Sequence, residues 1–297
     1  MDLLQLKYFR TVARLEHMTR AAEELMIAQP ALSQTISRLE DELGVLLFDR
    51  LGRRIRLNLF GQAFLVRVER IFAELEQAQA ELADLAGGNR GEVVLALGAA
   101  THLIPDLLSD YRQQHPQISF RLFQQRVTTM VQQLEQGAFD FCITAPPLHK
   151  PGIASIPLLT EEIALALPPA HRLEKRKRIR LSEVAGEAFL SLKAGHGLRD
   201  LTDAYCLQAG FTPQIAFESD DPSTLRGLIR AGQGIAFVPT ISWRGSLGPS
   251  VVQVQIEEPR CERTIGLAWL EQRYLSVAAE QFRTFIKEYF ARLSQAE

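Results

Sequence analysis

Residues 29–38 carry amide and hydroxyl side chains at the spacing of one helix face. This face consists of Pro30, Ser33, Gln34 and Ser37, with Arg38 on its flank. Serine and glutamine can hydrogen-bond to base edges in the major groove of DNA, and an arginine beside them can pair with a phosphate. These residues could therefore recognise double-stranded DNA, or they could form the solvated face of an ordinary amphipathic helix.

A helix that begins near residue 29 would hold these side chains outward. Its buried stripe would consist of four apolar residues at spacings of four, three and four: Leu32, Ile36, Leu39 and Leu43. Pro30 suits a first helical turn, where its missing N–H needs no partner. A shorter helix precedes it, with Thr19 as the expected N-cap. Residues 19–38 thus predict two helices joined by a tight turn, as in a helix-turn-helix.

An arginine-rich segment follows directly after this helix pair. Its charges are Arg50, Arg53, Arg54 and Arg56, and Gly52 marks the turn of a short hairpin. In a winged helix-turn-helix such a loop lies against the DNA backbone or in the minor groove. A run of charges is usually only a solvated surface, but its position directly after the helix pair favours a wing.

The overall composition does not by itself indicate a protein that binds nucleic acid. The 297 residues contain 33 Lys plus Arg and 35 Asp plus Glu, for a net charge of −2. Basic character is therefore local, in the arginines of the hairpin. The length predicts about two domains. No apolar run is long enough to span a membrane, and residues 1–10 lack the apolar core of a signal peptide, so we expect a cytoplasmic protein.

Residues 1–61 resemble the DNA-binding domain of LysR-type transcriptional regulators. The matching motifs are LKYF (6–9), AAEEL (21–25), AQPALSQTISRLEDELGVLLFDR (28–50) and LNLFG (57–61). The resemblance implies base and phosphate contacts by Gln29, Pro30, Ser33, Gln34, Arg38 and Arg53. The residue pattern adds Ser37, Arg50 and Arg54 to this set. Ala28 departs from the Ser or Thr of many members, which removes an N-cap, and Asn58 replaces the usual Thr.

Residues 61–89 predict a long helix that ends in a hinge. Apolar residues alternate at spacings of four and three: Phe64, Val68, Ile71, Leu75, Ala78, Leu82 and Leu85. Three heptads of this kind predict a helix that pairs with a second copy of itself. The alternative is a helix packed on its own domain, which the many charged residues on the remaining faces disfavour.

From residue 90 onward, buried strands alternate with helices, which predicts an α/β sheet. This region resembles the effector-binding domain of the same family, with its periplasmic-binding-protein-like fold. We therefore expect an α+β multidomain chain. Its parts are a winged helix-turn-helix domain at 1–60, a dimerising linker helix and hinge at 61–89, and a regulatory domain at 90–297. The last would contain two Rossmann-like subdomains, one at about 90–160 plus 268–297 and one at about 161–267.

Polar residues follow several of the predicted strands, where open α/β sheets bind ligands. They are Thr101, Thr128, Thr129, Thr144, His196 and Ser219. The resemblance implies a small-molecule effector there, between the two subdomains, with Arg199 adding a charge near a carboxylate. Each threonine alone could merely cap a helix, but their convergence on one set of turns favours a site.

Two further similarities concern the effector. LRDLTDAYCLQAGF (198–211) and GLIRAGQGIAFVP (227–239) are similar to the branch that controls glutamate synthase. A dicarboxylate such as 2-oxoglutarate or glutamate is therefore expected. Residues 194–206 are also similar to the segment that carries the paired cysteines of the peroxide-sensing branch. Gly197 stands where the reactive cysteine would be, so we expect Cys206 to be a buried structural residue.

An enzyme and a stand-alone solute-binding protein are the competing classes. The sequence has no dinucleotide, phosphate-loop, zinc-protease or nucleophile-elbow motif, and a lone G-x-G at 232–234 lies between a helix and a strand. Six scattered histidines and three cysteines show no metal spacing. We expect no catalytic residues, cofactor, metal ion or membrane contact. The expected partners are promoter DNA, an effector and further copies of the chain, in a homodimer or tetramer.

Overall fold

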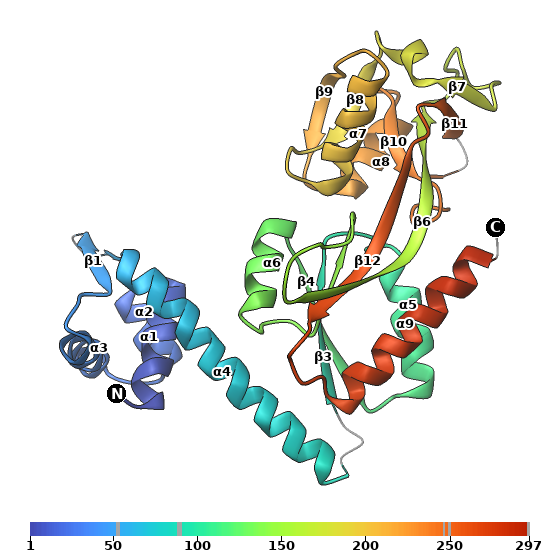
Figure 1. Ribbon diagram of the computed structural model, residues 1–297. Coiled ribbons are helices and arrows are strands. Elements are labelled where there is room, and N and C mark those ends of the chain that lie inside the picture. Colours follow the sequence, from blue (N-terminus) through green and yellow to red (C-terminus); the bar gives the residue numbers. More distant parts are fainter. Residues whose placement is uncertain (52–53, 88–90, 246, 249–250, 296–297) are drawn as a thin grey trace. The chain divides into compact units, whose positions relative to one another are not determined.

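The computed structural model describes residues 1–51, 54–87, 91–245, 247–248 and 251–295, which form two compact units (Figure 1). The first unit comprises Met1–Ala83 with Gln136–Ala138, and the second comprises Asp84–Glu135 with Phe139–Glu297. Each unit has hydrophobic cores of its own.

The first unit is built from helices and one β-hairpin. Its elements are α1 (Leu3–Leu15), α2 (Met18–Glu24), α3 (Gln29–Leu43), β1 (Phe48–Leu51), β2 (Arg54–Leu57) and the long helix α4 (Leu59–Leu85). Both helices of the predicted pair and the strands of the hairpin are therefore confirmed. Leu32, Ile36 and Leu39 are at most 3% exposed and pack around the fully buried Phe9 of α1.

The starts of the two helices differ in their capping. His17 rather than Thr19 is the N-cap of α2, because the His17 Nδ1 atom accepts the Arg20 backbone N–H at 3.4 Å and Thr19 already lies inside the helix. Ala28 precedes α3 without a side-chain cap, as the sequence indicated. Pro30 in the first turn of α3 reduces the number of N–H groups that need a cap.

Two side chains fix the hairpin and the start of α4 relative to α3. The Glu40 carboxylate on α3 accepts the backbone N–H groups of Leu47 at 2.7 Å and Phe48 at 3.3 Å. The Asn58 side chain accepts the Gly61 N–H at 2.9 Å, as an N-cap does. The residue that departs from the family pattern at position 58 therefore keeps a capping role.

Helix α4 has a packed part and an exposed part. Val68 is fully buried in the core of the first unit, and Phe64 lies against Phe9 with ring centroids 5.2 Å apart. The prediction that Val68 faces a second copy was wrong, because the core of the first unit covers it, and the partly buried Phe64 packs against α1 on the same side. The later apolar positions are exposed: Ile71 (38%), Leu75 (39%), Leu82 (66%) and Leu85 (78%).

The second unit contains two α/β lobes. Lobe I has β3 (Gly91–Leu97), α5 (Ile104–Gln114), β4 (Ile118–Gln124), α6 (Val127–Glu135), β5 (Phe141–Thr144) and α9 (Val277–Gln295). Lobe II has β7 (Arg178–Arg180), the short 3-10 helix η1 (Leu181–Val184), β8 (Ala188–Leu192), α7 (Gly197–Gln208), β9 (Gln214–Ser219), α8 (Pro222–Arg230), β10 (Ala236–Pro239) and β11 (Val252–Glu258). The predicted alternation of strands and helices is confirmed.

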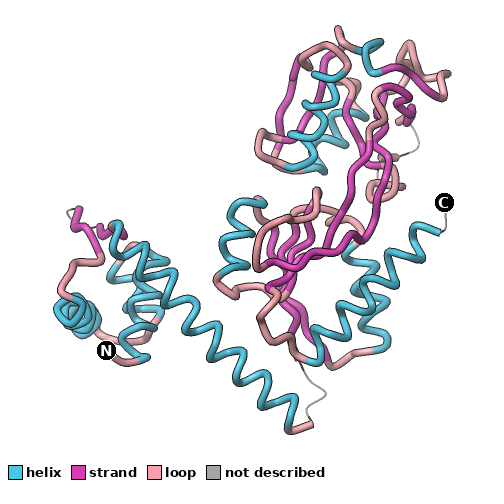
Figure 2. The backbone as a smooth tube through the Cα atoms, viewed as in Figure 1, coloured by secondary structure: helices cyan, strands magenta, loops and turns pink. Residues whose placement is uncertain are grey.

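Two long strands run through both lobes. β6 (Ile153–Leu167) and β12 (Glu262–Leu270) are antiparallel neighbours over most of their length (Figures 1 and 2). In lobe I the strand order is β4-β3-β5-β12-β6, with β3 parallel to β4 and β5. In lobe II, β6 pairs with β10 and β11. Lobe II is thus inserted between β5 and α9 of lobe I, and α9 buries Phe282, Ile286 and Phe290 there.

A buried ion pair lies where the two long strands pass from one lobe to the other. Glu161 on β6 is 2% exposed and Arg263 on β12 is 7% exposed, and they face each other in the strand register. The Arg263 Nε atom donates to the Glu161 Oε1 atom at 2.8 Å. Two buried charges are stable only when they are paired in this way.

Residues 240–243, the hinge strap, cover this ion pair. The backbone N–H groups of Ile241 and Ser242 donate to Glu161 Oε2 at 3.0 and 2.7 Å. Ile241 belongs to the core of lobe I and Trp243 to the core of lobe II. The hinge strap therefore joins the two lobes beside the long strands. Among the described residues, none of the helices has the length and apolar character needed to cross a membrane.

Candidate functional site

The polar face of α3 in the first unit carries the side chains that the sequence predicts as DNA contacts. Gln29, Pro30, Gln34, Ser37 and Arg38 are exposed, and Ser33 is half-buried. Within the described part of the chain, none of these side chains has a hydrogen-bond or ion-pair partner. The opposite face is anchored by the buried stripe, so the polar groups project from a fixed helix.

The hairpin beside α3 is described in part. β1 and β2 pair antiparallel, with Arg50 opposite Ile55 and Leu51 opposite Arg54. Gly52 and Arg53, where the sequence predicts the turn of the wing, lie outside the described residues. The side chains of Arg50 and Arg54 lie outside them too, whereas Arg56 is exposed on β2.

A cleft of about 480 Å³ lies between the two lobes of the second unit. Lobe I contributes the end of β3 and the turn from β4 into α6, and lobe II contributes the turns that lead into α7 and α8. The polar side chains that line it are Gln124, Gln125, Arg126, Lys193, His196, Asp220 and Asp221. The volume falls within the ~300–1,000 Å³ of small-molecule sites. Three helices begin at the cleft, and helix N-termini favour anions.

An acid and two cations meet at the edge of the cleft. The Lys193 Nζ atom lies 2.6 Å from Asp220 Oδ2, and an Arg126 nitrogen from the other lobe lies 4.0 Å from Asp220 Oδ1. The hydrogen bond from Lys193 lowers the pKa of Asp220, and the charge of Arg126 contributes. All three side chains are at least half exposed, so water screens their ion pairs and a ligand can exchange with them.

Two polar atoms in the walls of the cleft have no hydrogen-bond partner in the described protein. They are Gln125 Oε1 from lobe I and His196 Nδ1 from lobe II, and both atoms are buried. Burial and the charge of Arg263 lower the pKa of His196, while Asp200 and Asp220 oppose this. His196 is therefore neutral near pH 7 and adds no positive charge to the cleft.

The sequence-predicted effector residues lie at the expected turns but differ in their access to the cleft. His196 lines it. Thr128 and Thr129 are exposed in the first turn of α6, after the cleft residue Val127. Ser219 immediately precedes Asp220 and accepts the Asp221 backbone N–H at 3.0 Å.

Thr101 and Thr144 lie deeper in lobe I. Thr101 is half-buried in the turn after β3. Thr144 is fully buried at the end of β5, where its hydroxyl donates to the Pro146 carbonyl at 2.8 Å. Neither side chain lines the cleft in this structure.

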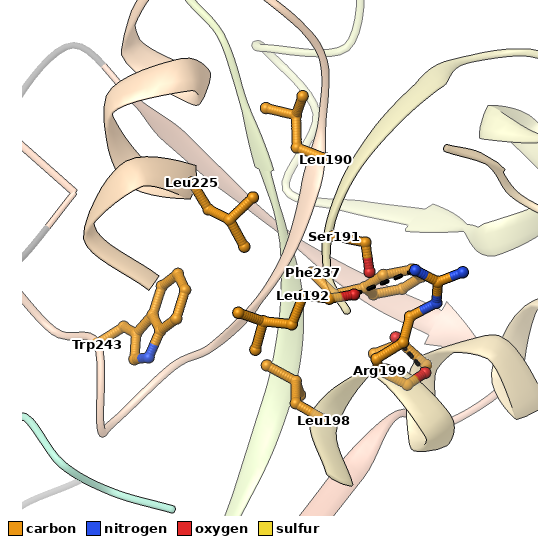
Figure 3. Close-up of a pocket in the computed structure, with 9 residues that line it drawn as sticks. Leu190, Ser191, Leu192, Leu198, Arg199, Leu225, Phe237 and Trp243 are labelled. Carbon is orange, nitrogen blue, oxygen red and sulfur yellow. Dashed lines mark hydrogen bonds between the residues drawn. The ribbon is translucent and has the colours of Figure 1, made fainter. Parts of the chain in front are cut away.

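Arg199 is held within lobe II by groups of that lobe. Its Nε atom lies 2.6 Å from Asp203, and its Nη1 atom donates to Glu218 at 2.9 Å. The same Nη1 atom donates to the Leu192 carbonyl at 3.1 Å (Figure 3). The residue lines a separate apolar pocket of about 10 Å³, together with Leu192, Leu198, Leu225 and Trp243 (Figure 3). That space is about the size of one water molecule.

A second contact between the lobes lies beside the hinge strap. Arg226 of α8 donates from Nη1 to His102 Nε2 at 2.5 Å, and its guanidinium carbon lies 5.3 Å from the centroid of Trp243. His102 accepts this bond only as a neutral imidazole. Burial lowers the pKa of His102, as do the charges of Arg226 and Arg263, whereas Asp221 opposes this.

Gly197 at the start of α7 lies close to the backbone of lobe I. A Cβ atom at this position would overlap the Ala145 carbonyl oxygen, so no side chain fits. By the sequence resemblance described above, this is the position at which the peroxide-sensing branch would have its reactive cysteine. Cys206 is fully buried, as expected, and burial raises the pKa of its thiol to about 12. Within the described residues, no His, Cys, Asp and Glu side chains group as metal ligands would.

Sequence reasoning did not select as effector contacts six polar side chains that line the cleft: Gln124, Gln125, Arg126, Lys193, Asp220 and Asp221. A signal was present, since each stands at the end of a predicted strand or in the polar residues immediately after one. The threonines were predicted as contacts instead because they match the family pattern.

Comparison with known proteins accounts for both units. Residues 3–62 match the bacterial regulatory helix-turn-helix protein model of the lysR family, and residues 86–291 match the LysR substrate binding domain. The chain belongs to the LysR-type transcriptional regulators.

Similar proteins span the whole length of this LysR-type regulator. It is 38% identical over 293 residues to the uncharacterized HTH-type transcriptional regulator YybE of Bacillus subtilis, covering 98% of the chain and 100% of the relative. It is 31% identical to the transcriptional dual regulator GltC of the same organism, covering 99% of each. The structure of a full-length OxyR variant from Pseudomonas aeruginosa has a TM-score of 0.73 at 26% identity, covering 98% of the regulator and 94% of that chain.

These findings confirm the family resemblance, the helix-turn-helix and the effector-binding domain. LysR-type regulators bind DNA and small-molecule effectors and form oligomers; they are not enzymes. For this LysR-type regulator, the face of α3 and the cleft between the lobes are thus the candidate sites for DNA and effector.

Proposed function

We propose that this regulator reads a roughly palindromic duplex site with α3. The contacts would come from Gln29, Pro30, Ser33, Gln34, Ser37 and Arg38, and phosphate or minor-groove contacts from Arg50, Arg53 and Arg54. The supporting observation is a polar face without internal partners on a helix whose other face is buried. Two copies of that face in a symmetric dimer would require two half-sites.

Gel retardation with DNA from the regulator's own promoter region tests this proposal. Replacing Ser33 and Gln34 by Ala should reduce discrimination between operator and random DNA by ~1–3 kcal/mol. Arg53→Ala should weaken binding to both DNAs and lower the salt dependence. Ser109→Ala with Gln113→Ala is the matched control, because these exposed residues lie on α5 in lobe I. Unchanged discrimination in the Ser33 and Gln34 variant contradicts the proposal.

We propose that the cleft between the lobes binds a small carboxylate, with 2-oxoglutarate and glutamate as the first candidates. Lys193, Arg126 and the helix N-termini at the cleft support an anionic ligand. His196 is proposed as a direct contact. Thr101, Thr128, Thr129 and Ser219 are proposed as contacts that are made when the lobes move, and Thr144 and Arg199 as positioning residues.

Calorimetric titration of the full chain with small carboxylates tests the cleft. Lys193→Met and Arg126→Met should each weaken binding about tenfold, because each removes a charge-assisted bond. Lys287→Met is the control, since this exposed lysine lies on α9 away from the cleft. If only uncharged ligands bind, or if both cleft variants bind as well as wild type, the carboxylate proposal fails.

We further propose that the exposed part of α4 pairs two chains through Ile71, Leu75, Leu82 and Leu85, and that dimers assemble into a tetramer. Residues 1–60 would bind DNA, 61–89 would link and dimerise, and 90–297 would respond to the effector, in a cytoplasmic protein. Light scattering should show smaller assemblies for Ile71→Asn with Leu75→Asn. An unchanged mass contradicts the pairing.

A further inference from the structure

The cleft carries an acceptor set as well as cations, and this narrows the class of ligand beyond the proposed carboxylate. Asp220 lies between Lys193 and Arg126, and the buried Gln125 Oε1 atom in the opposite wall has no donor in the described protein. Resting on the proposed function, we propose that the effector is a zwitterionic α-amino acid. Its carboxylate would bind to Lys193 and Arg126, and its ammonium group to Asp220 and Gln125.

The charges at the edge of the cleft are balanced rather than positive. Lys193 and Arg126 both contact Asp220. The second acid, Asp221, is already used as the N-cap of α8, where it accepts the Ser223 and Thr224 N–H groups at 2.9 and 3.0 Å. His196 is neutral near pH 7. Asp220 is therefore the acid of the cleft that can change partners.

A ligand that carries only negative charge fits this arrangement poorly. Its carboxylate would compete with Asp220 for the same two cations and would place two carboxylates side by side, which disfavours the charged form of both. A zwitterion avoids this conflict, because its ammonium group compensates Asp220 while its carboxylate takes the cations.

The unpartnered acceptor points to the same class. A buried acceptor without a donor is unfavourable, and a ligand that supplies the donor gains that energy on binding. An ammonium group provides three N–H donors, whereas a carbonyl group provides none. An amino acid and the corresponding 2-oxo acid should therefore differ in affinity mainly through Gln125 and Asp220.

Titration of the full-length protein with L-glutamate, 2-oxoglutarate and glutarate tests this inference, after a thermal-shift screen of the common L-amino acids for a better-fitting side chain. We expect an L-amino acid to bind about tenfold or more tightly than its 2-oxo and deaminated analogues. Asp220→Asn should weaken binding of the amino acid, because it removes the partner of the ammonium group. The same change should strengthen binding of the analogues, because it removes the carboxylate that competes with theirs for Lys193 and Arg126. Asp110→Asn, which makes the same change of charge on α5, should alter neither.

The outcomes separate this inference from the proposal on which it rests. If 2-oxoglutarate or glutarate binds at least as tightly as every amino acid, the zwitterion is wrong and the carboxylate effector stands. An equal effect of Asp220→Asn on both ligand classes also overturns the inference. If no carboxylate binds with or without an amino group, both fail.

Discussion

The face of α3 and the cleft between the lobes differ in how far their polar groups are already engaged. Side chains such as Ser33 and Gln34 have no partner in the described protein, so they can bind DNA without breaking a hydrogen bond or ion pair within the protein. In the cleft, Asp220 pairs with Lys193 and Arg126. Outside the cleft, beside the hinge strap, a hydrogen bond joins His102 to Arg226 between the lobes. The face of α3, whose side chains are free within the described protein, suits the recognition of a DNA sequence. The cleft must exchange its own contacts when a ligand binds, as a conformational switch requires.

The largest expected effect comes from breaking the buried ion pair between Glu161 and Arg263, which should leave the polar face of α3 unchanged. Glu161→Gln leaves Arg263 buried beside a neutral partner, which should destabilise the second unit by ~3–5 kcal/mol. Urea unfolding followed by tryptophan fluorescence measures this, because Trp243 and Trp269 both lie in that unit. Glu92→Gln is the control: it breaks an exposed pair with Arg121 and should cost at most ~1 kcal/mol. Equal losses in the two variants would show that the hinge pair does not stabilise the unit.

Gly197→Ala should have the next largest effect, and it should affect the cleft between the lobes but not the face of α3. The added Cβ would overlap the Ala145 carbonyl oxygen, so α7 must move away from lobe I. We expect a loss of ~1–3 kcal/mol in stability, together with weaker effector binding and unaltered binding to operator DNA. Gly186→Ala has no neighbour within 4 Å and serves as the control. Effector affinity equal to that of wild type would argue that the approach of α7 to lobe I has no role in the cleft.

Acidification should weaken the contact between the lobes more than it changes the reading face. The lowered pKa of His102 means that the folded protein takes up this proton less readily than the unfolded chain, whose histidines titrate near ~6.5. The stability from neutral His102 is therefore complete above that pH and is lost as the pH falls through the lowered folded pKa. Unfolding of wild type, His102→Gln and His149→Gln at a series of pH values should show a smaller slope only in His102→Gln. The same slope in all three contradicts this.

The smallest effect concerns oxidation. Peroxide should leave DNA binding unchanged, because Gly197 replaces the partner thiol and burial raises the pKa of Cys206 to about 12. Retardation of operator DNA before and after peroxide treatment tests this, with Cys206→Ser as the comparison. A response in wild type that Cys206→Ser abolishes would overturn it.

The reading face could be predicted from the sequence because it is contiguous. Helical periodicity alone places Gln34 opposite Leu32 and Ile36 and Ser33 on the flank of that buried stripe, and the structure agrees, with Gln34 exposed and Ser33 half-buried. The cleft is assembled from four turns that are far apart in the chain. The sequence indicated where the strands end, but the residues that line the cleft depend on how the two lobes meet.

The linker helix shows a second limit of sequence patterns. Its heptad spacing indicates which residues are buried, but not what buries them. Val68 fits the spacing as well as Leu75 does, yet Phe9 and its neighbours in the same chain cover Val68. Asn58 shows the reverse case, since a departure from the family pattern preserved the capping role.

The insertion of lobe II between β5 and α9 also sets the order in which the lobes can be completed during synthesis. The ribosome delivers all of lobe II before β12 and α9 emerge. Until then β3 and β5 lack the helix that buries Phe282, Ile286 and Phe290 against them. The lobe that begins first must therefore finish last, and its half-made sheet is the surface that nascent-chain chaperones would have to shield.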